Sequence, residues 1–173
     1  MPLLDANGYR ADPWIRIAAG EPATGDAVLV GLADLAAVIA GRSNAQRIGV
    51  EVANTVRLAD LGAFLGQLDL VAIAFPAFND GRAFSLARQL REAGFKGAVR
   101  AVGPVIADQF THLVACGFDE VEVPDAIAAR QPEAQLRAAL ASYGATYQTG
   151  YGAAGASILE RRGALRAGQG AAS

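Results

Sequence analysis

Five short apolar segments alternate with helix-like segments between residues 26 and 123, and this alternation restricts the fold more than any other feature of the chain. Each segment has the length of a strand and is almost continuously hydrophobic, as is typical of strands covered on both faces. Strands that alternate with helices are joined by right-handed crossovers, which predicts a mainly parallel sheet. The predicted strands are residues 26–32, 47–53, 68–75, 97–103 and 118–123.

Helical periodicity follows each predicted strand, and Pro132 starts a separate final helix because proline is tolerated in a first turn. The predicted helices are residues 32–41, 56–68, 81–94, 105–117 and 126–144. This pattern predicts an α/β fold of flavodoxin-like type, with a five-stranded sheet and helices on both faces. The alternative is a partial or incomplete (β/α) barrel, since a complete barrel needs about 250 residues and this chain has 173.

The chain divides by composition into an N-terminal arm (1–25), a single α/β domain (26–148) and a flexible tail rich in Gly and Ala (149–173). Its first residues carry charges and no apolar signal core. No apolar run approaches the ~18 residues of a membrane span. We therefore expect a cytoplasmic protein that does not bind a membrane.

Metal and cofactor chemistry is restricted because Cys116 is the one cysteine and His112 the one histidine. A single chain cannot supply the four ligands of an iron–sulfur cluster or of a structural zinc site. A formal net charge of −2 argues against a nucleic-acid partner. Neither glycine-rich nucleotide-binding motif occurs, so no cofactor is identifiable, and a flavin remains open without motif support.

The stretch "FPAFNDGR" (75–82) is the first candidate site, because it joins a predicted strand to a predicted helix. Asn79 or Asp80 can cap the helix, and Gly81 leaves room for a ligand near the backbone. Arg82 can offer a charge-assisted fork to an oxyanion. The alternative is an ordinary capped turn with a solvated arginine.

Glu51 and Arg100 place charges inside predicted strands, where an unpaired charge is expensive to bury. The sequence leaves two alternatives: the two side chains form ion pairs with each other or with neighbouring residues, or they point into a binding site. If the third and fourth strands are adjacent, Arg100 is expected to join Arg82 around an anion or an acidic side chain, Glu51 or Glu122.

Asp108, His112 and Cys116 recur at i, i+4 and i+8, which places them near one another on a helix. A thiolate beside an imidazole is a reactive combination. Cys116 lies at the end of the helix before Gly117, however, where a small buried residue fits. We expect Cys116 to be structural and His112 to be a polar flank.

Residues 10–148 resemble a family of bacterial proteins of unknown function. Its members are often described as oxidoreductases involved in sulfite reduction and are encoded beside sulfite reductase and phosphoadenylylsulfate reductase. The run F-P-x-F-x-D-G-R-x-x-S-x-A-R-x-L-R matches Phe75, Pro76, Phe78, Asp80, Gly81, Arg82, Ser85, Ala87, Arg88, Leu90 and Arg91. Two further runs match Gly97, Arg100, Ala101, Val102 and Gly103, and then Asp108, Gln109, Cys116, Gly117, Phe118 and Asp119. Pro104 and Ala115 depart from the family pattern, which has Asp and Arg there.

The resemblance implies an accessory protein of assimilatory sulfite reduction, in sulfur assimilation and cysteine biosynthesis. It implies binding of a sulfur oxyanion, a nucleotide phosphate or a partner enzyme, with sulfite reductase and phosphoadenylylsulfate reductase as the candidate partners. The alternative is a small oxidoreductase that binds a flavin or a phospholigand. A second copy of the chain, in a homo-oligomer, is a further candidate partner. The implied ligand-binding residues are Asp80, Gly81, Arg82, Arg88, Arg100, Asp108 and Gln109.

Overall fold

A computed structural model of the chain describes residues 2–5, 7–77, 80–104 and 107–125, with the backbone alone for 107–109. Its strands are β1 Leu3–Asp5, β2 Gly8–Arg10, β3 Ile15–Arg16, β4 Ala27–Gly31, β5 Arg47–Ala53, β6 Leu70–Ala74, β7 Ala98–Val102 and β8 Glu120–Glu122. Its helices are α1 Leu35–Gly41, α2 Leu58–Leu61, the 3₁₀ helix η1 Leu65–Gln67, α3 Arg82–Glu92 and α4 Ala107–Ala115. The helix predicted over 126–144 and the tail at 149–173 lie outside the described residues.

All described strands belong to one eight-stranded sheet in the order β2-β1-β8-β7-β6-β5-β4-β3. The five predicted strands are β4 to β8, and each is parallel to the next one along the chain. β3 adds to the β4 edge in parallel, whereas β1 pairs antiparallel with both β8 and β2. The α/β class and the parallel central strands are therefore confirmed.

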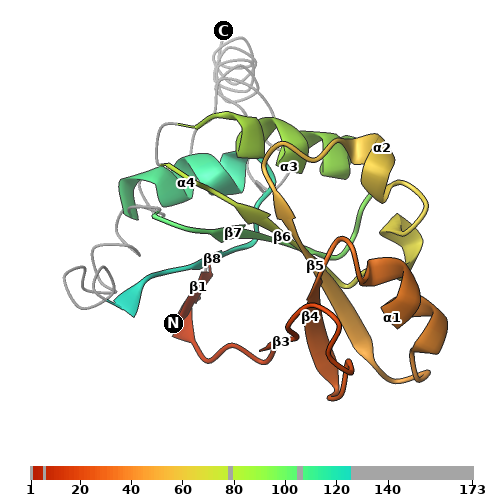
Figure 1. Cartoon of the computed structure of the whole chain (residues 1–173). Helices are drawn as coiled ribbons and strands as arrows, with labels where there is room; N and C mark the ends of the chain where they lie inside the picture. The colour runs from red at the N-terminus through yellow and green to blue at the C-terminus, as the bar shows by residue number, and fades with distance from the viewer. Residues whose placement is uncertain (1, 6, 78–79, 105–106, 126–173) are drawn as a thin grey trace, which may run out of the picture.

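The predicted flavodoxin-like layering is wrong. A doubly wound sheet reverses its strand order at a switch point, but β4 to β8 lie in sequence order. Because right-handed crossovers between sequential strands carry every helix to the same side, the helices lie around the outside of a curved sheet (Figure 1). The sheet is curled into a half-barrel, which is the alternative that the sequence left open.

The two faces of the sheet carry different side chains. On the outer face, alternate residues such as Val50, Val71 and Val99 form one large apolar cluster with the helices. On the inner face, the intervening positions include Gly49, Ala72 and charged groups. A Cβ at Gly49 would lie 3.1 Å from Leu29 and Leu70 side-chain atoms, so small residues are needed there. Because Gly and Ala do not stand out as polar in the sequence, the strands were predicted to be covered by helices on both faces.

The N-terminal segment covers part of the inner face. Trp14 packs against a small cluster of Leu29, Leu70 and Ala72, and β3 then aligns Ile15 with Val28 of β4. The three N-terminal strands were not predicted, because strands of two or three residues are too short to show a period. The predicted helix 56–68 is also divided into α2 and η1, with Gly62 at the end of α2.

Candidate functional site

The Asp-Gly-Arg corner (Asp80, Gly81 and Arg82) follows β6 at the edge of the sheet where parallel strands end. Ligands of parallel α/β sheets bind at this edge. The last residue of β5, Ala53, is paired with the last residue of β6, Ala74. The segments that leave β5 and β6 therefore start side by side, and the corner begins α3.

Asp80 and Arg82 form a side-on ion pair. Nε of Arg82 donates to Oδ1 of Asp80 at 3.0 Å, and Nη2 donates to Oδ2 at 2.6 Å. The backbone N–H of Arg82 also donates to Oδ1 at 3.1 Å, so Asp80 caps the start of the helix although Gly81 is the N-cap residue. The Arg82 side chain, then the nearby Asn54 side chain, and then the Arg82 backbone lower the pKa of Asp80 well below its usual range.

The second edge of the Arg82 guanidinium faces away from this ion pair. A guanidinium carries five N–H donors, and Nη1 of Arg82 donates to no described residue. The side chain is 59% exposed. Because the Asp80 carboxylate fixes the orientation of the plane, the open edge is preorganised to bind an oxyanion in a bidentate manner.

Asn54 is a second polar group at this corner. It directly follows β5, is 7% exposed, and its Nδ2 has no hydrogen-bond partner among the described residues. The amide lies near enough to Asp80 to help lower its pKa, but without the distance and angle of a hydrogen bond. A buried donor left unpaired costs about 1–3 kcal/mol. Asn54 was not among the predicted site residues: its position after a strand places it at the ligand-binding edge of the sheet but does not show which segment it faces.

Gly81 differs from the strand-end glycine Gly103. Gly103 has φ +136° and a Cβ there would lie 2.3 Å from the Phe75 carbonyl oxygen, so the backbone requires glycine. Gly81 has φ −73°, which any residue adopts, and a Cβ there would meet nothing within 4 Å. The fold does not need glycine at Gly81, so space in front of α3 is left open.

Arg100 lies on the inner face and is not brought to Arg82. Its side chain is fully buried. Nη1 and Nη2 donate to the two carboxylate oxygens of Asp12 at 2.8 and 3.0 Å, and Nε donates to Glu120 at 2.7 Å. β6 and β7 are adjacent, as expected. Strand alternation nevertheless points Arg100 inward, whereas Arg82 starts a helix on the outer face.

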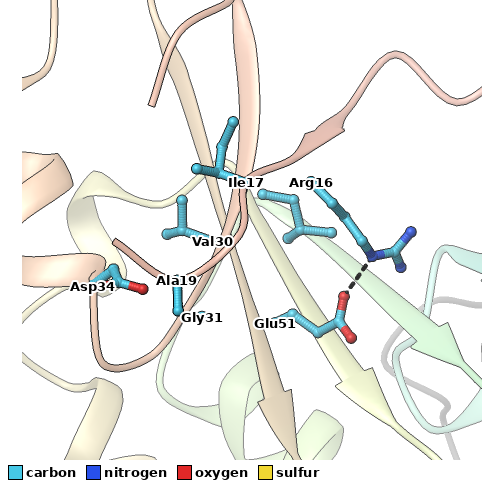
Figure 2. A pocket seen from close by; sticks show the side chains of 8 residues that line it. Arg16, Ile17, Ala19, Val30, Gly31, Asp34 and Glu51 are labelled. Carbon is cyan, nitrogen blue, oxygen red and sulfur yellow. Dashed lines mark hydrogen bonds and ion pairs between the residues drawn. The ribbon is translucent and has the colours of Figure 1, made fainter. Parts of the chain in front are cut away.

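Glu51 also lies on the inner face, and its partner is Arg16 rather than Arg100. Arg16 Nε donates to Glu51 at 2.8 Å, and the two Nη atoms donate to Glu122. Glu122 and then Glu51 raise the pKa of Arg16, against the effect of its partial burial. Figure 2 shows this ion pair beside a pocket of about 290 Å³, which is also lined by Asp34 and Ile17.

Arg88 lies beside Cys116, six residues after Arg82 on α3. Cys116 is buried, and its Sγ lies 3.8 Å from His112 Nε2. Burial raises the pKa of the Cys116 thiol, although Arg88 acts in the opposite direction. A thiol with a raised pKa is a poor nucleophile at neutral pH. The ring of Phe84 is half-buried and lies 4.7 Å from the His112 ring.

The two remaining implied residues, Asp108 and Gln109, lie in α4, and their side chains are outside the described part of the chain. Within that part, no group of three or more His, Cys, Asp or Glu side chains is placed to hold a metal ion. None of the described helices combines the length and the apolar character required to span a membrane.

A family model for bacterial proteins of unknown function, DUF934, matches residues 49–156, which is more than half of the chain. The chain belongs to this family. For this DUF934 protein, the match includes most of β5, all of β6 to β8 and the whole Asp-Gly-Arg corner, together with Asn54. Comparison with curated proteins finds no match. The family description names no reaction, so the link to sulfite reduction stays a prediction.

Proposed function

We propose that this DUF934 protein is an accessory protein of assimilatory sulfite reduction. It binds a sulfur oxyanion or a nucleotide phosphate at the Asp-Gly-Arg corner. The observation that carries the proposal is the guanidinium of Arg82, which Asp80 holds by one edge while the other edge is exposed. The N-terminal end of α3 adds a favourable field for an anion, because the first N–H groups of a helix have no acceptor within the helix.

The association with sulfite reduction rests on the family resemblance of the run from Phe75 to Arg91. In this proposal, sulfite reductase or phosphoadenylylsulfate reductase is the partner enzyme. Co-purification with the sulfite reductase hemoprotein tests the partner separately from the ligand.

Isothermal calorimetry with sulfite, sulfate and adenosine phosphosulfate tests the ligand. We expect Arg82→Ala to weaken binding about ten- to hundred-fold, the scale of a hydrogen bond to a charged group. Arg57→Ala is the matched control, because Arg57 makes a similar side-on pair with Asp60 but lies outside the corner, immediately before α2. The proposal fails if wild-type protein binds none of these anions, or if both variants bind them equally well.

The alternative, a small oxidoreductase that binds a flavin or a phospholigand, is tested by the absorbance spectrum of the purified protein. A flavin band would favour an enzyme, since cofactors supply the difficult redox chemistry. The calorimetry above covers the phospholigand.

A further inference from the structure

We propose that the Asp-Gly-Arg corner selects a singly charged oxyanion, such as a sulfonate, hydrogen sulfite or a phosphodiester, and that Asn54 is the neutral donor that sets this preference. This inference rests on the proposed function and specifies the chemical class of its ligand. It starts from the charges of the groups that meet at the corner.

The corner has no net charge. The guanidinium of Arg82 carries one positive charge, and Asp80, the carboxylate that holds it, carries one negative charge. Asp80 remains ionised at neutral pH, because Arg82 and Asn54 lower its pKa. A doubly charged ligand would place its second charge beside the Asp80 carboxylate with no second cation to offset it, and like charges at short range repel. A single negative charge avoids most of this repulsion.

Asn54 adds hydrogen-bond donors without adding charge. Its Nδ2 is buried and unpaired, so it cannot obtain a partner from bulk water without a change in structure. A ligand oxygen that accepts from Nδ2 would remove the cost of the unpaired donor. Gly81 places no side chain in front of the helix, and a Cβ there would meet open space. Because Nδ2 is not accessible to solvent, one ligand can contact Arg82 and Asn54 together only after the Asn54 side chain rotates toward the corner.

The pair of Arg57 and Asp60 shows that the ion pair alone does not define the site. Arg57 Nε and Nη2 donate to Asp60 at 3.2 and 2.9 Å, and the Arg57 backbone N–H also donates to this carboxylate. The geometry thus resembles that of Asp80 and Arg82. No buried unpaired amide is found beside Asp60 among the described residues. Asn54 is the feature that distinguishes the corner from a surface ion pair.

Calorimetry with three probes tests the charge preference of the wild-type protein. We expect methanesulfonate, a monoanion, to bind at least about tenfold more tightly than sulfate, a dianion. Sulfite should bind more tightly as hydrogen sulfite forms between about pH 8 and pH 6, while methanesulfonate stays unchanged. The methanesulfonate series controls for any effect of pH on the protein itself.

Two substitutions test the role of Asn54. Asn54→Ala should weaken methanesulfonate binding about tenfold without lowering thermal stability, because it removes a donor that the fold leaves unpaired. Asn54→Asp should abolish binding of every anion by adding a negative charge. Asn54→Ser, checked by circular dichroism, replaces Asn54→Ala if the latter does not fold.

The outcomes separate the two proposals. If sulfate binds as tightly as methanesulfonate while Arg82→Ala still weakens binding, the charge preference is wrong and the proposed function stands. If Asn54→Ala and Asn54→Ser both fold and bind like wild type, the role of Asn54 is wrong. If Arg82→Ala changes the affinity for no anion, the proposed function itself fails.

Discussion

The outer and inner faces of the same sheet are stabilised in different ways. The outer face packs apolar side chains from β4 to β8 against the described helices in one cluster. The inner face has a small apolar cluster around Leu29 and Trp14, and beside it a network of ion pairs centred on Arg100. Apolar packing is non-directional and tolerates many partners, whereas a buried ion pair requires particular partners in good geometry.

This difference explains why the N-terminal segment matters to the half-barrel. Asp12 from this segment pairs with Arg100, while Arg10 and Arg16 pair with Glu120 and Glu122. The segment thus supplies charges opposite to those that the sheet presents. A few residues with matching charges can cover a face that would otherwise need a second layer of helices or a second half-barrel.

The largest expected effect is on the outer face. Phe110 is 1% exposed, and Phe110→Ala should lower the free energy of unfolding by about 3–5 kcal/mol because it leaves a cavity. Urea denaturation at about pH 5 and pH 8 should give the same loss, since no charge is involved. Val114→Ala, at a half-buried position of the same helix, should lower the free energy of unfolding less than Phe110→Ala does.

Arg100→Met should lower the free energy of unfolding by roughly 3 kcal/mol, as much as Phe110→Ala or slightly less. The reason is that it leaves Asp12 and Glu120 without this partner. The pH dependence should differ from that of Phe110→Ala. Buried carboxylates without a cation acquire a raised pKa in the folded state, so the folded variant binds more protons and loses stability as pH rises. A loss that is equal at about pH 5 and pH 8 would contradict this account of the inner face.

Glu51→Gln should have a smaller effect, about 1 kcal/mol, because the side chains of Arg16 and Glu51 are 43% and 35% exposed and solvent screens their pair. Pairing raises the pKa of Arg16, so its contribution is present below the unfolded pKa and should be constant across neutral pH. Denaturation of Arg16→Gln, Glu51→Gln and the double variant measures the coupling. A coupling as large as the loss in Arg100→Met would remove the distinction between the buried and exposed parts of the network.

Gly81→Ala should have the smallest effect on stability, within about 0.5 kcal/mol, because its backbone is unstrained and its Cβ would meet open space. It should nevertheless weaken anion binding at the corner, where the methyl group would occupy ligand space. Thermal melting and calorimetry of this variant test both statements. Gly103→Ala is the contrasting control, since its positive φ and the close Phe75 carbonyl should make it strongly destabilising.

Much of the fold could be predicted from local patterns. The apolar runs located β4 to β8, and helical periodicity located α1, α3 and α4. The layering was wrong, because Gly49 and Ala72 look apolar in the sequence but lie on a narrow inner face that no described helix covers. Glu51 and Arg100 were the local signs of that face.

The candidate site was located in part. The segment after β6 was found from its Asp-Gly-Arg sequence, and Asp80 does cap the start of α3. Asn54 was missed because nothing in the sequence shows that an amide after one strand is buried beside the corner after the next. Arg100 was assigned to the corner because strand adjacency was considered without the face to which its side chain points.

Local patterns were enough to establish the parallel β/α units, since hydrophobic periodicity and glycine positions are properties of neighbouring residues. The side of the sheet on which the helices lie depends on strand order, which no local pattern records. The same holds for the partners of Arg16 and Arg100, which lie 106 and 88 positions away along the chain in Glu122 and Asp12. Ion pairs between such distant residues form only when the sheet curves, because the curvature brings the N-terminal segment across the inner face.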